Sequence, residues 1–342
     1  MAIPEIVSVE AVTTPATKLI ANAQTDLGLH GLLLDRDHAR QRVAEDIRLL
    51  QALAPHLPQL PDADVHDVYE RVVEAEATAV GPKRQLNDYS GGTATHDDEL
   101  RIVDQGTGNL LEAQHATDPV RKDSGKREAA DHGTGGLGLV LAEDAGGRII
   151  VPLGRQTGNA NTDAKHPIKD ELLAAAATGA YDQFFSVHGM RPGKVLDLRD
   201  VSEIHAVIGL GLNPTEADFE RAERLLGRAY AEYGLRLVIG NRIPHLNFQK
   251  ADDWDGTSFR DWTHEPQRRP DGAIGATRVA ALMPTSTVTF MREQTGLSSS
   301  QLEISRSLRL MPRDMYRRPD RKAEAYGVYL GYQLCRLALE TR

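Results

Sequence analysis

The sequence of 342 residues has little cysteine and no long apolar run. Cys335 is the only cysteine, so an intrachain disulfide is impossible and a zinc site built from several cysteines is excluded. Nowhere does the chain offer the stretch of about 18 apolar residues that spanning a membrane requires. The N-terminus has neither a basic start nor a continuous apolar segment. These absences predict a cytoplasmic protein with no membrane partner.

An excess of positive charge is also lacking, since 40 Lys and Arg stand against 49 Asp and Glu and the formal net charge is −9. Nucleic acid is therefore not the expected partner, because phosphate binding needs a concentrated basic surface. One local basic cluster occurs in the C-terminal part and comprises Arg306, Arg309, Arg313, Arg317, Arg318, Arg321 and Lys322. We expect most of its members to lie on a solvated or ion-paired face, rather than to form a rim that binds anionic substrates.

The composition, with 40% hydrophobic and 26% charged residues, is typical of a folded globular protein. Apolar residues recur at helical spacing over residues 15–80, a section without chemical motifs that we interpret as a helical cap or oligomerisation arm. We divide the chain into a helical N-terminal extension, residues 1–95, and an α/β domain, residues 96–342. The oligomeric state is left open, and a homo-oligomer is one alternative.

Helical and extended patterns alternate through most of the second part of the chain. This alternation predicts a three-layer α/β/α fold with a mixed, largely parallel central sheet. Helices are expected at 137–142, 170–177 and 216–233, and strands at 148–153, 184–187, 235–239, 279–283 and 300–304.

Two further segments are expected to be loops that shape a binding site. The first, residues 82–113, is polar and rich in glycine and contains His96, Asp97 and Asp98. The second, residues 242–275, contains Trp254, Trp262 and His264, which we interpret as a lid.

His115, Asp131 and His188 are the residues that carry most chemical information. His115 follows the apolar stretch that begins at Leu110, and His188 follows the expected strand at 184–187. Both are therefore expected at the carboxyl ends of strands, where open α/β sheets bind ligands. Two imidazoles and one carboxylate form the ligand set of a catalytic zinc whose fourth position is left for water. In a late strand, Glu303 supplies a carboxylate that could work beside such a metal.

Three blocks of the sequence resemble the N-formylglutamate amidohydrolase-like family, whose members are relatives of the zinc carboxypeptidases. They are His115-Ala116 with Arg121, Lys126, Asp131 and Gly133-Thr134-Gly135, then Ser186-Val187-His188-Gly189, and last Gln301-Leu302-Glu303-Ile304-Ser305-Arg306. The resemblance covers roughly residues 110–312 and implies that residues 96–342 form a zinc-hydrolase-like domain. It also implies that His115, Asp131 and His188 bind zinc.

The sequence departs from the family pattern in two places. Ser186 stands where family members usually have Asp two positions before the second histidine, so support for His188 must come from another residue. The first histidine and its acidic partner are unusually far apart, which leaves Glu128 as an alternative to Asp131. We prefer Asp131 because Gly133-Thr134 resembles the turn that opens the next helix.

The resemblance implies that Glu303 is the general base, which takes a proton from water and delivers it to the departing amine. Its structural alternative is an ion pair with Arg306. We assign Arg121 to the developing oxyanion, with a surface salt bridge as the alternative. Substrate-binding residues are expected among the side-chain hydrogen-bond donors in two places, after the expected strand at 148–153 and just before the one at 279–283. They are Arg155, Asn159, Asn161, Lys169 and Arg278.

The sequence thus predicts a zinc-dependent amidohydrolase that cleaves an amide bond of a small acidic or peptide-like substrate. One alternative is a zinc carboxypeptidase or isopeptidase. An alternative of another class is a noncatalytic ligand-binding protein on the same scaffold.

Overall fold

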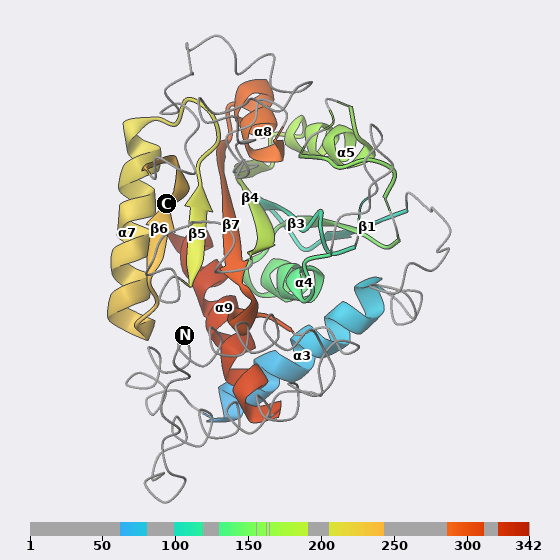
Figure 1. Cartoon of the computed structure of the whole chain (residues 1–342). Helices are drawn as coiled ribbons and strands as arrows, with labels where there is room; N and C mark the ends of the chain where they lie inside the picture. The colour runs from blue at the N-terminus through green and yellow to red at the C-terminus, as the bar shows by residue number, and fades with distance from the viewer. Residues whose placement is uncertain are drawn as a thin grey trace, which may run out of the picture.

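A seven-stranded mixed sheet forms the centre of the computed structural model (Figure 1). The strands are ordered β1-β3-β2-β4-β7-β5-β6. Their bounds are β1 Leu100–Asp104, β2 Gly108–Glu112, β3 Arg148–Pro152, β4 Tyr181–Met190, β5 Ala206–Gly209, β6 Leu237–Ile239 and β7 Ser298–Ser305. The structure describes residues 62–80, 99–117, 119, 130–154, 156–161, 163, 165–190, 205–242, 286–310 and 321–341.

Parallel pairing dominates the middle of the sheet. Strands β3, β2, β4 and β7 run parallel to one another, whereas β1 and β5 are antiparallel to β3 and β7, and β6 is parallel to β5. The carboxyl ends of β2, β4 and β7 therefore meet at one edge of the sheet. In the register of β4 with β7, His188 lies opposite Glu303.

Helices cover both faces of this sheet (Figure 1). Their bounds are α3 Asp62–Val80, α4 Thr134–Ala145, α5 Pro167–Ala176, α7 Glu216–Tyr233, α8 Thr287–Thr295 and α9 Arg321–Glu340. Buried residues of α5 and α8 form one core cluster, and those of α3, α4, α7 and α9 form a larger one. The predicted three-layer α/β/α fold with a largely parallel sheet is confirmed.

Strand β4 shows why the sheet is buried on both sides. Successive side chains of a strand point to opposite faces, and Phe184 accordingly joins the smaller core while Phe185 and Val187 join the larger one. A strand covered on both faces reads as an apolar run rather than as an alternation, which is why residues 184–187 were identifiable as a strand from the sequence.

Helix α3 packs against α4 and α9 through an apolar stripe that includes Val65, Val68 and Val72. At its solvent side Arg71 pairs with Asp144 of α4 at 2.6 Å. The helix expected in this part of the N-terminal extension is confirmed, and it contributes to the same core as the sheet. Residues 1–61 lie outside the described part, and the domain boundary at residue 95 stays a prediction.

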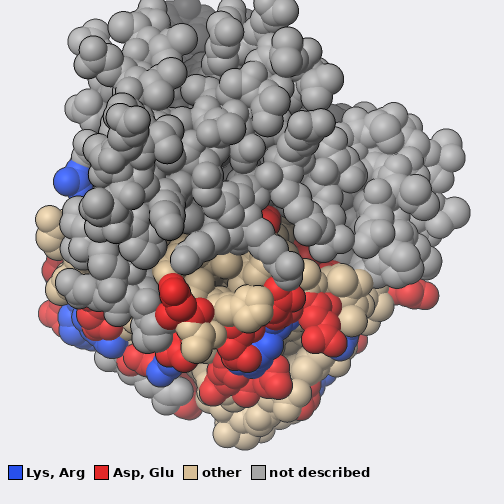
Figure 2. All heavy atoms as spheres, turned by 90° about the horizontal axis from the view of Figure 1, so that it is seen from below, with Lys and Arg blue, Asp and Glu red and all other residues tan. Residues whose placement is uncertain are grey.

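Acidic side chains are widespread on the described surface that Figure 2 shows, which faces downward in Figure 1. Helix α3 contributes four exposed acids, Asp62, Asp64, Asp67 and Glu74. The distribution agrees with the net charge of −9. Among the described helices, none is both long and apolar enough to cross a membrane.

The expectation of a loop over residues 82–113 is wrong for its second half, which contains β1 and β2. Strand β2 begins with Gly108-Asn109 and ends with the fully buried Glu112, so its polar residues concealed its bounds, although the apolar stretch from Leu110 had indicated a strand before His115. Residues 206–209 form β5, which was not expected. The expected strand at 279–283 and the loop after residue 242, with Trp254, Trp262 and His264, lie outside the described residues, as do His96, Asp97 and Asp98.

Candidate metal centre

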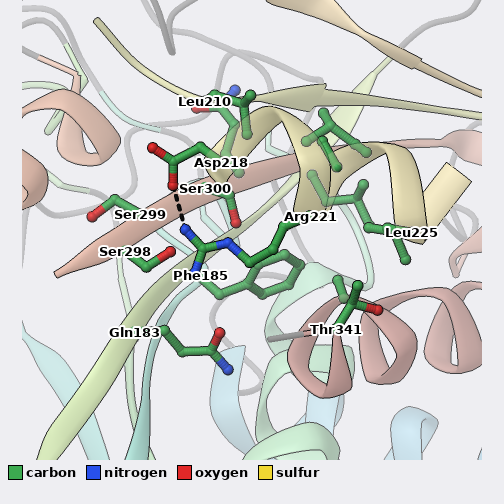
Figure 3. Close-up of a pocket in the computed structure, with 15 residues that line it drawn as sticks. Gln183, Phe185, Leu210, Asp218, Arg221, Leu225, Ser298, Ser299, Ser300 and Thr341 are labelled. Carbon is green, nitrogen blue, oxygen red and sulfur yellow. Dashed lines mark hydrogen bonds and ion pairs between the residues drawn. The ribbon is translucent and has the colours of Figure 1, made fainter. Parts of the chain in front are cut away.

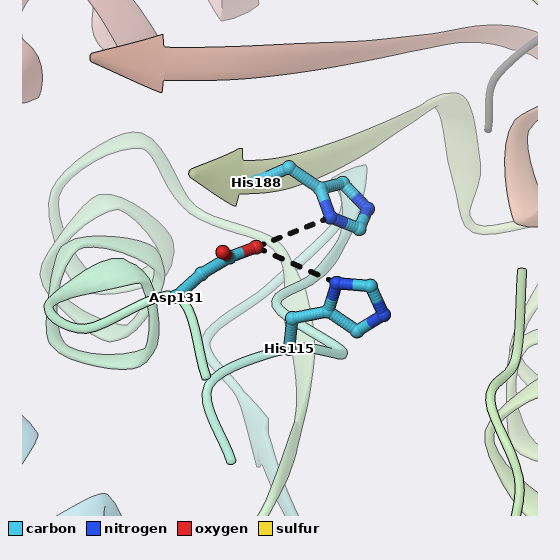
Figure 4. Close-up of side chains that lie close together, drawn as sticks. All are labelled: His115, Asp131 and His188. Carbon is cyan, nitrogen blue, oxygen red and sulfur yellow. Dashed lines mark ion pairs between the residues drawn. The ribbon is translucent and has the colours of Figure 1, made fainter. Parts of the chain in front are cut away.

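The structure brings His115, Asp131 and His188 together at the carboxyl ends of β2 and β4 (Figure 4). Oδ2 of Asp131 lies 3.5 Å from Nδ1 of His115 and 3.5 Å from Nδ1 of His188. The two imidazoles meet edge to face, with ring centroids 4.9 Å apart and an interplanar angle of 86°. One ligand atom from each residue thus falls within 4.8 Å of the others.

This donor set fits a divalent metal ion. Tetrahedral ligands at the usual zinc distances of about 2.0–2.2 Å lie roughly 3.3–3.6 Å from one another, close to the two separations of 3.5 Å observed here. His188 is buried, whereas His115 and Asp131 are partly exposed. The group is therefore accessible from one side and supported by protein on the other, and it could hold a metal ion.

Backbone hydrogen bonds place the Asp131 carboxylate next to His115. The Asp131 amide donates to the His115 carbonyl at 2.7 Å, and the Asp131 carbonyl accepts from the amide and hydroxyl of Thr134. Gly133, at φ 83°, makes the turn into α4, where an added Cβ would lie 2.6 Å from the Leu310 backbone. The residues that suggested a helix start after Asp131 therefore form one.

Helix α3 supports this turn from outside the sheet. Oε1 of Glu76 accepts from the Gly133 amide at 3.0 Å, and Oε2 accepts from the Gly136 amide at 2.6 Å. The amides at the N-terminus of a helix have no partner within the helix, so a carboxylate there satisfies them and interacts favourably with the helix dipole. Glu76 thus stabilises the segment that carries Asp131.

A fixed acceptor lies on the far side of the His115 ring. Oδ1 of Asn159 accepts from the Asn161 amide at 2.8 Å, which identifies this atom as the oxygen, and it lies 3.3 Å from Nε2 of His115. His115 must therefore carry a proton on Nε2. In the neutral ring the Nδ1 lone pair then faces Asp131, as metal ligation through Nδ1 requires, whereas in the protonated ring Nδ1 donates to Asp131.

His188 has a different partner. Nε2 of Gln114 lies 3.1 Å from Nε2 of His188 and also donates to Glu112 at 3.3 Å. An amide nitrogen is a donor, so His188 accepts on Nε2 and, when neutral, carries its proton on Nδ1. Burial lowers the pKa of His188, which favours the neutral ring. Gln114 thus provides the support for His188 that Ser186 cannot provide.

Ser186 instead turns to a buried carboxylate that the sequence analysis missed. Its hydroxyl donates to Oε1 of Glu112 at 2.8 Å, and the Thr287 hydroxyl donates to the same oxygen. Glu112 is fully buried, and Oε2 has no hydrogen-bond partner among the described residues. Burial raises its pKa to about 7, against the two hydroxyl donors, which lower it. A further carboxyl group is therefore linked to the candidate metal ligand His188 through Gln114.

Glu303 lies beside His188 on the neighbouring strand β7. Nε2 of Gln301 donates to Oε1 of Glu303 at 2.8 Å. Burial raises the Glu303 pKa to about 8, repulsion from Asp131 adds to the rise, and the charges of His115 and Arg309 oppose it. A carboxyl with a pKa near neutrality can both take up and release a proton. The side chain of Arg306, its alternative partner, lies outside the described part.

The pKa of Asp131 is shifted in the opposite direction to that of Glu303. Burial opposes its ionisation, yet the hydrogen bonds of His115 and His188 outweigh burial and hold the Asp131 pKa far below its usual range. The two carboxyl groups are thus separated into a permanent anion and a group that can exchange a proton, a division of roles typical of acid–base sites.

The described substrate-binding candidates contact other protein groups. Asn161 accepts from the Thr287 amide through Oδ1 at 3.2 Å. Lys169 is buried, donates to the Asp163 carbonyl at 2.5 Å and lies over the Phe290 ring, and burial lowers its pKa to about 8. Their roles in substrate binding stay predictions. The remaining candidates, Arg121, Arg155 and Arg278, and the alternative ligand Glu128 lie outside the described residues.

Arg309 is an exception within the basic cluster. Most members of the cluster were expected on a solvated or ion-paired face, and Arg309, whose side chain is the one described, is only 6% exposed and donates to the carbonyl of His132, next to Asp131. Neither Arg309 nor Glu112 could be assigned from the sequence, because each is a charged residue in a segment whose burial depends on distant strands.

A separate pocket lies between α7, α9 and the amino-terminal halves of β4 and β7 (Figure 3). It is lined by Asp218, which pairs with Arg221, and by the serines that begin β7. None of the three candidate metal ligands lines this pocket. The candidate metal centre therefore lies at the opposite end of these strands from the pocket.

The fold and this group define an α/β protein with a candidate metal centre at the carboxyl edge of its sheet. Among solved structures, the chain is similar to a metallo-carboxypeptidase from Burkholderia cenocepacia, with 14% identity, a TM-score of 0.33 and coverage of 77% of this chain and 68% of that one. It is also similar to a metallo-carboxypeptidase from Pseudomonas aeruginosa in complex with (2-guanidinoethylmercapto)succinic acid, with 13% identity, a TM-score of 0.35 and coverage of 80% and 69%. No protein-family model matches the sequence, and no curated protein is found to match it. A likeness at these scores establishes neither the family nor the activity of this chain.

Proposed function

We propose that the protein is a zinc-dependent hydrolase that cleaves an amide bond of a small acidic or peptide-like substrate, as N-formylglutamate amidohydrolases do. The observation that carries the proposal is the convergence of two imidazole nitrogens on one carboxylate oxygen, each at 3.5 Å, beside a carboxyl group of raised pKa on the next strand. A metal ligand set next to a proton-exchanging group is the arrangement expected of a metal-assisted hydrolase.

His115, Asp131 and His188 would hold the metal, which when bound acidifies water and polarises a substrate carbonyl. Asn159 orients His115, and Gln114 contacts the outer nitrogen of His188. Glu303 takes a proton from the attacking water and delivers it to the departing amine. Gln301 is bonded to Oε1 of Glu303, so we assign the proton transfer to Oε2.

The decisive experiment combines metal analysis with the Glu303→Gln substitution. Purified protein is expected to contain about one zinc ion per chain. Glu303→Gln should retain the metal and lose at least about a hundredfold in kcat, because general acid–base catalysis typically contributes 10²–10⁴-fold. Glu293→Gln, at an exposed position of α8, is the matched control and should leave both quantities unchanged.

Formyl-amino acids and short peptides should be offered as parallel substrate series. Turnover of the first series supports the amidohydrolase, whereas removal of C-terminal residues from peptides supports the carboxypeptidase alternative. Metal-free protein with full activity would end the proposal. Protein that binds zinc and a ligand without changing the ligand chemically would instead be the noncatalytic binding protein.

A further inference from the structure

The guanidinium group of Arg309 contacts the residue that follows each of three site residues. Nη1 donates to the carbonyl of His132, which follows Asp131, at 2.8 Å. Nε donates to the carbonyl of Ile304, which follows Glu303, at 3.4 Å. The group also packs on Gly189, which follows His188, where an added Cβ would lie 2.4 Å from Cζ.

These contacts lie on the opposite side of β4 from the His188 ring. Successive residues of a strand face opposite ways. The guanidinium therefore packs where a side chain of residue 189 would lie, and any residue larger than glycine would displace it. Arg309 itself is 6% exposed, so it cannot point into solvent as a surface arginine does. The absence of a side chain at Gly189 and the burial of Arg309 are thus two parts of one packing arrangement.

The position also has an electrostatic consequence. Asp131 and Glu303 are two partly buried carboxyl groups, and repulsion from Asp131 raises the pKa of Glu303. Burial is the largest influence on both pKa values and disfavours ionisation, while the charge of Arg309 acts in the opposite direction on both. A single buried cation thus reduces the cost of assembling the two carboxyl groups.

We propose that Arg309 is a positioning residue that fixes the backbone segments carrying Asp131, His188 and Glu303 relative to one another. Its planar fork reaches two carbonyl oxygens while its face covers a third segment, which the point charge of a lysine cannot do. The inference rests on the proposed function for its chemical meaning, since what Arg309 positions is the candidate metal centre and its base.

Arg309→Lys tests the proposal because it keeps the charge and removes the fork. The matched control is Arg292→Lys, since Arg292 also bonds a backbone carbonyl of β7, that of Ser299, but lies near the other end of the strand. Zinc affinity, measured by competition with a chromophoric chelator, should fall at least about tenfold in Arg309→Lys, the usual effect of losing a residue that orients ligands. Arg292→Lys should leave it unchanged, although both variants lose stability.

Hydrogen exchange of the metal-free proteins provides a second readout. Arg309→Lys should accelerate amide exchange around His132, Gly189 and Ile304 together, whereas Arg292→Lys should affect only the start of β7. Gly189→Ala, which displaces the guanidinium without changing it, should reproduce the Arg309→Lys pattern and serves if that variant does not fold.

The outcomes separate the two proposals. The positioning role would be overturned if Arg309→Lys and Gly189→Ala bound zinc as tightly as the wild type. It would also be overturned if Arg292→Lys lost as much zinc affinity as they do. Wild-type protein that binds no zinc would refute the proposed function, and exchange confined to one of the three segments would then refute the positioning role independently.

Discussion

Nε2 of His115 lies 3.3 Å from Oδ1 of Asn159, on the side of the ring that faces away from Asp131. Because the Asn161 amide also donates to this oxygen, the contact requires a proton on Nε2, and in the neutral ring Nδ1 then carries none. The ring is thereby prepared for a metal before any metal arrives, since a ligating imidazole nitrogen must be unprotonated.

Asn159→Ala should therefore weaken zinc binding roughly 10–100-fold, because it removes the acceptor that fixes the tautomer of His115. Asn159→Asp should retain zinc binding, since a carboxylate oxygen can accept from both Nε2 of His115 and the Asn161 amide. Competition titration with a chelator measures both variants. If Asn159→Ala binds zinc like the wild type but shows a raised KM, Asn159 serves the substrate, as the sequence predicted.

The two histidines should differ in their response to zinc. In the metal-free protein His188 is expected to carry its proton on Nδ1, because Gln114 donates to Nε2. When Nδ1 of neutral His188 binds a metal, the ring proton must be on Nε2. The side-chain amide of Gln114 can accept a hydrogen bond from that Nε2 if it rotates by 180°, so that its oxygen takes the place of its nitrogen. Oε1 of Gln114 has no hydrogen-bond partner among the described residues, so this exchange sacrifices no bond of that oxygen.

Nitrogen-15 NMR of the imidazoles tests this expectation directly. Zinc addition should move the protonated nitrogen of His188 from Nδ1 to Nε2 and leave the protonated nitrogen of His115 unchanged. His66, whose side chain is 71% exposed, is the internal control and should show no change. A proton already on Nε2 of His188 without zinc would contradict the assignment of the Gln114 amide.

The sequence identified the candidate ligands, which the structure brings together, but not the residues that contact them. His115, Asp131 and His188 could be selected because imidazoles and carboxylates follow expected strands or open an expected helix. Gln114 and Glu112 could not, since a polar residue in an apolar stretch acquires a partner only when strands distant in sequence pair. The neighbouring positions of His188 and Glu303 likewise depend on the order of β4 and β7, which no local pattern encodes.

Part of the fold was hidden for related reasons. Strands β3 and β4 were predictable from the apolar runs at 148–153 and 184–187, whereas β2 contains Asn109 and Glu112, whose burial is made possible by tertiary hydrogen bonds. Arg309 shows the same effect in a basic cluster. A charged residue is assigned to the surface by default, and only the missing side chain of Gly189 makes room for it inside.

Glu112 should make the stability of the metal-free protein depend on pH. Its pKa rises from an ordinary 4.5 to about 7 on folding, so between these values the unfolded chain loses a proton that the folded chain keeps. The free energy of unfolding should therefore fall as pH rises through this window and level off above it, by on the order of 3 kcal/mol. Glu112→Gln keeps an acceptor for Ser186 and Thr287 but cannot ionise.

Urea unfolding of the wild type and Glu112→Gln at pH 4.5 and pH 8, with a chelator present, isolates this contribution from that of other groups. The variant should gain stability relative to the wild type only at the higher pH. An equal difference at both pH values would show that Glu112 does not titrate in this window.

Glu76 should stabilise α4 and, through it, the segment that carries Asp131. Its two oxygens accept from the amides of Gly133 and Gly136, and the N-cap residue, Gly133, has no side chain to do so. Glu76→Ala should lower the free energy of unfolding by about 1–2 kcal/mol, comparable to the loss of a strong helix cap. Urea denaturation measures the loss, with Glu74→Ala, at an exposed position of the same helix, as the control.

Because the Asp131 carbonyl accepts a hydrogen bond from Thr134 at the start of α4, zinc affinity should fall in Glu76→Ala alone. Equal stability and equal zinc affinity in the two variants would show that α3 does not support the metal centre.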